Sequence, residues 1–503
     1  MLTRAPYDAL RAGFRWALPE RLNMAAQVLA HPDAKVAIVE DGRGALTYGD
    51  LRRMAGRLAA ALLARGVGRG DRVGVLRSQD GWCAAAHIAI WQIGAISVPL
   101  FKLFGEDALR VRLEDSGAAL VITDAESAGR VETPFVPEAE TLPNPLTKIA
   151  DTGPEDPALL IYTSGTTGKP KGALHGHRVL TGHLPGVEMS HDFLGQPGDV
   201  LWTPADWAWI GGLFDVLMPG LVLGVPVVAA RMAKFDPAEC AALIARHGVR
   251  NVFFPPTALR MLKAAGTRIE GLRSVASGGE PLGAEMLAWG REALGVTINE
   301  FYGQTECNMV ASSAASLFPP RPGCIGKPVP GFEVGVIDEE GNESAAEGDI
   351  AVRRGAASMM LHYWNNPRAT AEKFRGDWML TGDRGLWEEG YLRFVGRDDD
   401  VITTGGYRVG PAEIEDCLVT HPAVATAAVV GKPDPLRTEI VKAYVVLKPG
   451  AEADAATLID WVGTRLSPHL KPREVSFVDS LPMTVTGKII RKELKRRAAE
   501  ERP

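Results

Sequence analysis

Residues 158–172 read ALLIYTSGTTGKPKG, an apolar run followed at once by glycine, hydroxyl and lysine side chains. The apolar part, Ala158–Tyr162, predicts a buried strand. The next ten residues, Thr163–Gly172, hold three glycines, four hydroxyl residues and two lysines. Glycines let backbone amides approach an anion, and hydroxyl and ammonium groups donate to phosphate oxygens. The stretch predicts a phosphate-binding loop directly after a strand, although its spacing is not that of a P-loop.

Upstream of this loop, strand and helix patterns alternate. Short apolar strands are expected at residues 36–39, 72–76 and 96–100. Between them, one helix is expected after Thr47, with Asp50 three residues on as a capping partner, and another from residue 82. This alternation is typical of a parallel sheet with right-handed crossovers.

Downstream, similar strand patterns recur at residues 249–254 and 272–277. The most apolar window, Leu213–Ala230, is interrupted by one aspartate and two prolines. A membrane span needs about 20 uninterrupted apolar residues. We therefore interpret this window as core strands joined by turns.

The C-terminal half predicts two further units. Residues 323–397 contain short strands separated by glycine turns and are expected to form a β-barrel-like subdomain. Pro411 opens a helical pattern, as proline does at a first helical position, and strands and a second helix follow. The fold class is α/β and α+β, with a large N-terminal domain of parallel sheets at residues 1–398. A small, mobile α+β domain is expected at residues 399–503.

Composition is that of an ordinary soluble globular protein. Among the 503 residues, 46% are hydrophobic, and 55 Lys and Arg face 61 Asp and Glu for a net charge of −6. This balance argues against broad binding to nucleic acids or membrane surfaces. The five cysteines are scattered, which predicts free thiols in a reducing compartment. The first twenty residues lack the pattern of a signal peptide, so a cytoplasmic location is expected.

Four more motifs follow the phosphate loop in a fixed order. They are FYGQTE at 301–306, WMLTGD at 378–383, GRDDDVITTGGYRVGPAEIE at 396–415 and LPMTVTGK at 481–488. Together with TSGTTGKPKG they resemble the adenylate-forming (AMP-binding) acyl-CoA synthetase superfamily, in particular its acetyl- and medium-chain branch. The resemblance implies a two-step reaction with ATP, magnesium and CoA. An acyl-adenylate forms with loss of pyrophosphate, and a thiol then displaces AMP.

The resemblance also implies roles for individual residues at the nucleotide. Tyr302 would stack on adenine, Asp383 and Arg397 would contact the ribose, Thr305 would contact the α-phosphate, and Glu306 would hold magnesium. The residues assigned to ATP or AMP are Thr163, Ser164, Gly165, Thr166, Thr167, Gly168, Lys169, Gly279, Glu280, Pro281, Tyr302, Gly303, Thr305, Asp383, Arg397 and Lys488. Lys488, Thr305 and Glu306 are the catalytic candidates.

Two further features follow from the resemblance. Lys488 would stabilise negative charge during adenylation, and Asp399 would be the hinge between the two domains. Rotation at this hinge would remove Lys488 and deliver the CoA-binding residues Gly405, Gly406, Tyr407 and Arg408. Glycine at 406 would let the backbone approach pantetheine closely.

The resemblance also implies an acyl pocket at Trp209, Ile210, Gly211, Gly278 and Gly303. Acetate-specific relatives carry a tryptophan at the position of Gly303, so glycine would leave the pocket open for an acid larger than acetate. Each buried CH₂ contributes about 0.8 kcal/mol, which favours longer or bulkier acids. Straight medium-chain, branched and aromatic acids all remain candidates.

Three other functions compete with this interpretation. An adenylating enzyme could load the acyl group onto a carrier-protein thiol, which CoA-dependent AMP release would distinguish. A catalytically dead nucleotide sensor would be expected to lack Lys488, Glu306 or Asp383, and all three are present. A phosphotransferase would release ADP instead of AMP and pyrophosphate.

The stretch Pro482–Lys488 also fits a regulatory site. It reads PMTVTGK, a P-x-x-x-x-G-K pattern in which bacterial acetyltransferases modify the catalytic lysine of acyl-CoA synthetases. Acetylation would remove the ammonium charge. A lysine acetyltransferase and deacetylase are therefore expected partners, and the chain is expected to be a monomer or a homodimer.

Overall fold

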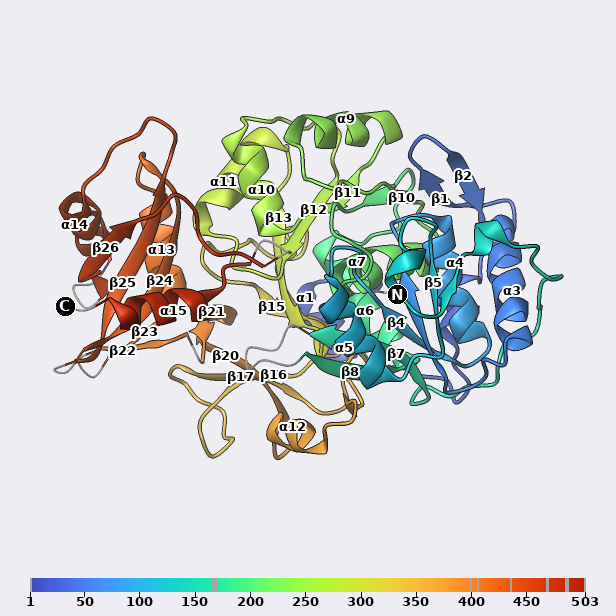
Figure 1. Cartoon of the computed structure of the whole chain (residues 1–503). Helices are drawn as coiled ribbons and strands as arrows, with labels where there is room; N and C mark the ends of the chain where they lie inside the picture. The colour runs from blue at the N-terminus through green and yellow to red at the C-terminus, as the bar shows by residue number, and fades with distance from the viewer. Residues whose placement is uncertain are drawn as a thin grey trace.

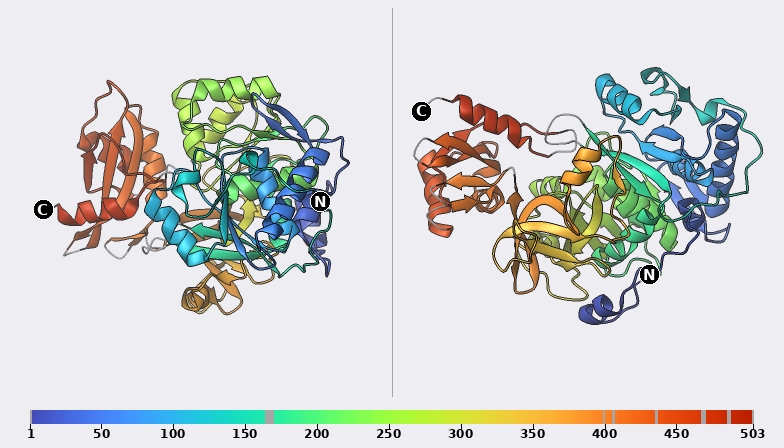
Figure 2. Two further views of the ribbon diagram at one scale, coloured as in Figure 1. Left: turned by 45° about the vertical axis from the view of Figure 1, so that its right-hand side comes forward. Right: turned by 90° about the horizontal axis from the view of Figure 1, so that it is seen from below.

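The computed structural model describes residues 2–163, 170–398, 400–404, 407–434, 437–466, 470–484 and 488–501. Four β-sheets organise these residues, as Figure 1 shows. Two large sheets with their helices form the bulk of the molecule. A third, antiparallel sheet lies beside them, and a small C-terminal unit lies at one end, as the two further views in Figure 2 also show.

The first large sheet carries the predicted phosphate loop. Its seven strands are, in spatial order, β18 (His362–Tyr363), β8 (Lys171–Gly176), β7 (Pro157–Thr163), β4 (Ile96–Pro99), β3 (Arg72–Leu76), β5 (Leu120–Thr123) and β6 (Pro134–Phe135). Strands from β7 to β6 pair in parallel, whereas β7–β8 and β8–β18 are antiparallel. The parallel part confirms the pattern of alternating strands and helices.

The second large sheet has nine strands. Their spatial order is β15 (Lys327–Pro328), β14 (Cys307–Ser312), β13 (Ile298–Gln304), β12 (Ser274–Gly278), β11 (Asn251–Phe253), β9 (Leu201–Trp202), β10 (Val227–Ala229), β1 (Val36–Glu40) and β2 (Gly44–Thr47). The run from β13 to β1 is parallel, and antiparallel pairs close both edges. The carboxyl ends of β12 and β13 therefore lie at one edge.

Helices cover and connect the two large sheets. They are α1 (Tyr7–Gly13), α2 (Met24–Val28), α3 (Tyr48–Ala64), α4 (Gly81–Gln92), α5 (Glu106–Ser116), α6 (Arg178–Ser190), α7 (Ile210–Gly212), α8 (Met218–Leu223), α9 (Pro237–His247), α10 (Pro256–Ala264), α11 (Ala284–Ala293) and α12 (Pro367–Glu372). The predicted start of α3 is confirmed, because Thr47 and Asp50 form a reciprocal capping box. Helix α4 is buried on nearly all sides, and one apolar core joins it to β1 and β3.

The window Leu213–Ala230 corrects the sequence-based interpretation. It is mostly helical: a π-helical turn, Leu213–Leu217, follows α7 and continues into α8, and only β10 is a strand. The residues of the π-helical turn are all buried, so the segment lacks the polar face that would reveal a helical period. Pro219 is tolerated because it lies in the first turn of α8.

The third sheet matches the predicted β-rich subdomain. Its strands are β16 (Val334–Ile337), β17 (Gly348–Arg353), β19 (Phe374–Arg375), β20 (Trp378–Glu388) and β21 (Tyr391–Arg397). Every pair in it is antiparallel. An isolated bridge between Gly326 and Leu392 links it to the segment before β15.

The C-terminal unit is a mixed α+β structure. It contains β22 (Ile402–Thr404), β23 (Tyr407–Val409), α13 (Pro411–Val419), β24 (Val424–Asp434), β25 (Thr438–Leu447), α14 (Ala455–Arg465), β26 (Glu474–Phe477) and α15 (Arg491–Glu500). The helix predicted to open at Pro411 is confirmed. None of the helices in the described ranges is long and apolar enough to cross a membrane. All five cysteines are buried and free.

Candidate active site

Predicted nucleotide residues lie on or beside strands of three sheets. Thr163 ends β7, Gly279 directly follows β12, and Tyr302 lies near the end of β13. Asp383 lies within β20 and Arg397 ends β21. Ligands of open α/β sheets bind outside the carboxyl ends of parallel strands. The residues at the ends of β7, β12 and β13 thus lie where such a sheet offers a binding crevice.

Tyr302 and Asp383 are in direct contact. The Tyr302 hydroxyl donates a hydrogen bond to Asp383 Oδ2, and Asp383 lies opposite Arg397 in the β20–β21 ladder. Burial, together with the Asp383 charge, raises the pKa of the Tyr302 hydroxyl well above its usual value. The phenol therefore stays protonated and holds the aromatic ring beside the carboxylate.

Lys488 reaches this cluster from the C-terminal unit. Figure 1 shows the segment before α15 extending toward β13. Residue 488 is exposed to solvent, but protein atoms around its ammonium group desolvate that group in part. This desolvation lowers the pKa of Lys488. Glu280 and Asp383 act in the opposite direction, and Arg397 acts in the same direction as desolvation. The ammonium group therefore stands among the charges of the predicted nucleotide site.

The segment Gly278–Pro281 forms another edge of the site. Arg260 on α10 donates to Glu280 Oε2 at 3.1 Å and to the Pro281 carbonyl at 2.9 Å. Gly279 has φ +95° and open space where a Cβ would lie, so its backbone is free to approach a ligand. Sequence reasoning missed Arg260, because no local pattern links it to a motif about twenty residues later.

Glu306 is buried in the turn between β13 and β14. The Tyr363 hydroxyl donates to Glu306 Oε1, and the Lys171 ammonium lies 5.4 Å from the centre of the Tyr363 ring. Within the described ranges, no group of three or more His, Cys, Asp or Glu side chains could hold a metal ion. Magnesium is commonly held by one or two carboxylates together with substrate phosphates. A single Glu306 carboxylate fits that mode of binding.

A second lysine of the site was not predicted. Lys373 Nζ donates to Gln304 Oε1 at 2.7 Å and to the Thr381 carbonyl at 3.3 Å. Burial lowers the pKa of Lys373, while the charges of Glu306 and Asp383 raise it. Because it follows α12 and lies outside every recognisable motif, only the folded structure brings it to the site.

The predicted acyl pocket begins with an aromatic wall. Trp209 precedes α7, and its ring lies 5.2 Å from that of Phe101 and 5.8 Å from that of Phe104. Ile210, the first residue of α7, is half-buried. Just beyond it, a Cβ built on Gly211 would lie 2.9 Å from the Phe253 ring.

Asn308 lies against Gly303, and the opening of the acyl pocket at this glycine stays a prediction. A Cβ on Gly303 would lie 2.1 Å from Asn308 Oδ1 and 2.9 Å from Asn308 Cα, and one on Gly278 would lie 2.6 Å from the Phe301 ring. The β13–β14 hairpin is responsible, because it turns back after Gln304 and places Asn308 against Gly303. Asn308 therefore occupies the space that a side chain at residue 303 would fill.

Several predicted residues lie outside the described ranges. They are Ser164, Gly165, Thr166, Thr167, Gly168 and Lys169 of the phosphate loop, the hinge residue Asp399, and Gly405 and Gly406 of the CoA segment. The backbone of Tyr407 and Arg408 belongs to β23.

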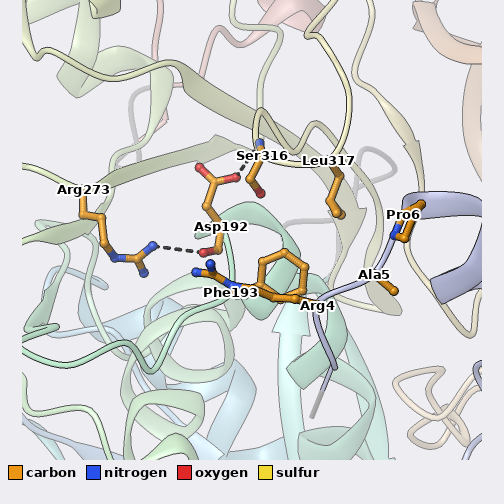
Figure 3. A pocket seen from close by; sticks show the side chains of 8 residues that line it. All are labelled: Arg4, Ala5, Pro6, Asp192, Phe193, Arg273, Ser316 and Leu317. Atoms are coloured by element: carbon orange, nitrogen blue, oxygen red, sulfur yellow. Dashed lines mark hydrogen bonds between the residues drawn. The ribbon is translucent and has the colours of Figure 1, made fainter.

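A surface hollow beside the N-terminal segment lies apart from these residues (Figure 3). It is lined by Arg4, Ala5, Pro6, Asp192, Phe193, Arg273, Ser316 and Leu317. Its polar groups already bond one another: Arg273 donates to the Asp192 carbonyl at 3.0 Å, and the Ser316 amide donates to Asp192 Oδ1 at 3.1 Å. None of the predicted site residues lines it, and we assign it no role.

Comparison with known proteins identifies the class to which this fold and site belong. The model of the AMP-binding enzyme family matches residues 24–364, and that of the AMP-binding enzyme C-terminal domain matches residues 413–488. The chain belongs to the AMP-binding enzyme family.

Individual relatives carry names of the same kind. The chain is 35% identical to an acetyl-coenzyme A synthetase of Bacillus subtilis, over 89% of this chain and 84% of the relative. It is 33% identical to a mitochondrial acyl-coenzyme A synthetase of Homo sapiens, over 98% and 93% of the two chains. It is 34% identical to a 4-hydroxybutyrate–CoA ligase of Metallosphaera sedula, over 91% and 85%.

Solved structures resemble the whole chain. The anthranilate CoA ligase AuaEII with anthranoyl-AMP has a TM-score of 0.87 at 28% identity, covering 96% of this chain and 98% of that one. ATP-bound MatB from Rhodopseudomonas palustris has a TM-score of 0.85 at 28% identity, covering 95% and 99%. The apo structure of MatB, at the same coverage and 27% identity, has a TM-score of 0.77.

Proposed function

We propose that this chain is an AMP-forming acyl-CoA synthetase, which joins a carboxylic acid to CoA and releases AMP and pyrophosphate. One observation carries the proposal: Lys488, from the C-terminal unit, stands among the charges of Asp383, Arg397 and Glu280 from the rest of the chain. Tyr302 lies in the same cluster through its hydrogen bond to Asp383. Such a cluster suits a nucleotide whose phosphate charge changes during reaction.

In the first step, a carboxylate oxygen of the acid attacks the α-phosphorus of ATP. A phosphorus–oxygen bond forms, the bond to pyrophosphate breaks, and an acyl-adenylate remains. We propose that Lys488, Arg397 and Lys373, which lie in the same group of charges, stabilise the charge on the phosphate oxygens. Fixed cations in a partly desolvated site act more strongly than they would in water.

In the second step, the thiol of CoA attacks the acyl carbon, loses its proton, and displaces AMP. We propose that rotation at Asp399 replaces Lys488 by the segment 405–408 between the two steps. The higher TM-score against ATP-bound than against apo MatB supports assigning the present arrangement to the first step. Lid-type rotations of this kind often limit turnover.

The acid is proposed to be larger than acetate, and medium-chain, branched or aromatic. Asn308, which fills the space beside Gly303, is much smaller than the indole that would close the pocket. The aromatic wall of Trp209, Phe101 and Phe104 offers apolar surface to an acyl chain. These two features support an acid with more than two carbons.

Magnesium is proposed to bind the phosphates of ATP, with Glu306 as its protein ligand. It would neutralise phosphate charge during adenylation. A cytoplasmic location is supported by five buried, free cysteines, which are usual in a reducing compartment. A monomer or a homodimer remains our proposal for the oligomeric state.

Acetylation of Lys488 is a further part of this proposal. The solvent exposure of its side chain would allow an acetyltransferase to reach it. Loss of the ammonium charge would stop the first step and leave the fold intact. Mass spectrometry of protein from its native host, with and without deacetylase treatment, tests this. Acetylated protein that adenylates normally would contradict it.

The function itself is tested by product analysis with a panel of acids. We expect pyrophosphate and AMP in equal amounts, with AMP release dependent on CoA. Release of ADP would indicate a phosphotransferase. Adenylate formation without CoA-dependent AMP release would favour loading of a carrier-protein thiol. No pyrophosphate with any acid would favour a nucleotide sensor.

A further inference from the structure

Three polar side chains form a buried cluster beside the predicted acyl pocket. His183 Nδ1 lies 3.0 Å from Asp215 Oδ1, and Asn308 Nδ2 lies 2.9 Å from both Asp215 oxygens. Exposure of the residues is only 1% for His183, 3% for Asp215 and 4% for Asn308. They come from three separate elements: α6, the π-helical turn after α7, and β14.

The position of this cluster connects it with the reacting end of the site. Asn308 is the residue that contacts Gly303, in the turn that continues to Thr305 and Glu306. Asp215 lies one helical turn after Gly211, and a Cβ on Gly211 would be 3.6 Å from Asp215 Oδ2. Two of the three glycines predicted to line the acyl pocket, Gly211 and Gly303, therefore adjoin the cluster.

Core packing alone is a poor explanation for these three residues. A buried carboxylate is costly, and apolar residues of similar size usually give equal or greater stability. Asp215 also lies in a π-helical turn, a distortion that occurs frequently at functional sites. A buried carboxylate in a π-helical turn departs from the usual rules of local folding, and such departures are expected at functional sites.

In the described part of the chain, the hydrogen-bonding positions of Asp215 and Asn308 that remain unused are all acceptors. Within the described ranges, Asp215 Oδ2 accepts only from Asn308, although a carboxylate oxygen has two lone pairs. Among the described residues, Asn308 Oδ1 accepts no hydrogen bond. Both free positions are acceptors, so a ligand that satisfies them must be a donor.

We propose that Asp215 and Asn308 determine specificity by accepting a hydrogen bond from a hydroxyl group on the acyl chain of the acid. This rests on the proposed acyl-CoA synthetase activity and adds the class of acid, a hydroxy acid. A methyl group in place of the hydroxyl leaves buried acceptors unpaired, which sites of this kind reject strongly. A second carboxylate on the acid is repelled by Asp215.

The first experiment compares hydroxy acids with analogues in which a methyl group replaces the hydroxyl. The pairs are 3-hydroxybutyrate with 3-methylbutyrate, 4-hydroxybutyrate with pentanoate, and 5-hydroxypentanoate with hexanoate. The readout is kcat/KM from CoA-dependent pyrophosphate release. We expect at least one hydroxy acid to exceed its partner by tenfold or more, and succinate to be inactive. A ratio of one or less in all three pairs overturns the proposal.

The second experiment repeats the best pair with variants. Asn308→Leu replaces the amide by an apolar group of similar size and is expected to reduce the ratio below one. Asn299→Ala is the control, because Asn299 is equally buried in β13 but bonds to the Ser190 carbonyl and Asp192. It is expected to leave the ratio unchanged. An unchanged ratio in folded Asn308→Leu overturns the proposal.

If Asn308→Leu fails to fold, Asp215→Asn provides the same test, because it keeps the size of the side chain. It is expected to lower the ratio at least fivefold, and an unchanged ratio overturns the proposal. A different result would contradict the proposed acyl-CoA synthetase activity itself: no acid of any kind would support CoA-dependent pyrophosphate release. Normal turnover of all acids without preference contradicts only the role of Asp215 and Asn308.

Discussion

The Tyr302 hydroxyl donates a hydrogen bond to the Asp383 carboxylate across 81 residues of chain. Tyr302 lies in a nine-stranded, largely parallel sheet and Asp383 in the five-stranded antiparallel one, so the contact joins two sheets at the predicted nucleotide site. The phenol bonds to one oxygen of the Asp383 carboxylate, and we expect the same carboxylate to accept from the ribose.

Removing this hydroxyl should weaken ATP use only moderately. Tyr302→Phe keeps the ring that would stack on adenine and loses one hydrogen bond to a charged group, typically about 1.5 to 3 kcal/mol. Part of this is recovered because the freed carboxylate is solvated. We expect kcat/KM for ATP to fall about tenfold in Tyr302→Phe and at least 100-fold in Tyr302→Ala. Equal losses would show that the ring does not contact the base.

Lys488→Ala should separate the two half-reactions. A lost charge donor costs about 10² to 10³ in rate, and we propose that Lys488 faces the nucleotide only in the arrangement for adenylation. We expect pyrophosphate release to fall by that factor and thioester formation from supplied acyl-adenylate to persist. Lys492→Ala, an exposed lysine on α15, is the control and should retain both activities. Equal loss of both steps in Lys488→Ala would mean that the lysine is structural.

Gly303→Trp should disrupt the site instead of converting it to acetate use. The indole would collide with Asn308, and overpacking of this kind costs about 1 to 3 kcal/mol or more. We expect a lower melting temperature and lost activity on all acids. Gly303→Trp combined with Asn308→Gly should restore folding and shift preference toward acetate. Full activity of the single variant on large acids would show that residue 303 does not face the acyl group.

Asp399→Pro should trap one domain orientation. Proline fixes φ near −65° and removes the torsional freedom that a hinge needs. Adenylate formation is expected to survive while transfer to CoA fails, measured as single-turnover release of pyrophosphate and AMP. The control is Asp399→Ala, which should turn over normally. A proline at Asp377 would not serve as a control, because it would perturb the turn between β19 and β20. Normal steady-state turnover in Asp399→Pro would place the hinge elsewhere.

Glu300 should make stability depend on pH. Burial raises its pKa to about 8, with a contribution from Asp416, although the Leu282 amide donates to it at 3.2 Å. The pKa of such a carboxyl is about 4.3 in the unfolded chain. A carboxyl with a higher pKa in the folded state stabilises that state, and this stabilisation is fully present at pH values below the unfolded-state pKa. This stabilisation is lost as pH rises through about 8. Glu300→Gln cannot ionise, so its melting temperature should gain on wild type between pH 5 and pH 9. A constant difference would contradict the shift.

Much of the local structure could be predicted because short-range rules govern it. The capping box of Thr47 and Asp50 involves residues three apart, and strand β3 at Arg72–Leu76 follows from one apolar run. The segment Leu213–Ala230 could not be read in this way. Its π-helical turn is buried on all sides, and without a polar face neither the helical nor the strand period is visible.

The missed residues of the candidate site share one property. Arg260, Tyr363 and Lys373 lie outside the motifs, and each reaches the site through a partner at least twenty residues away in the chain. Long-range contacts leave no mark in the local spacing of residues. The hydrogen bond that joins Tyr363 to Glu306 could be found only after the two large sheets had packed together.

The sequence by itself determined the order of the motifs, the strand that leads into the phosphate loop, and the residue types available for ATP chemistry. These depend on neighbours along the chain. Only the tertiary structure decided that Asn308 occupies the space beside Gly303 and that Asp215 and His183 lie behind it. The reason is physical: α6, the π-helical turn and β14 meet only when the core packs, and close packing permits a single occupant for each space.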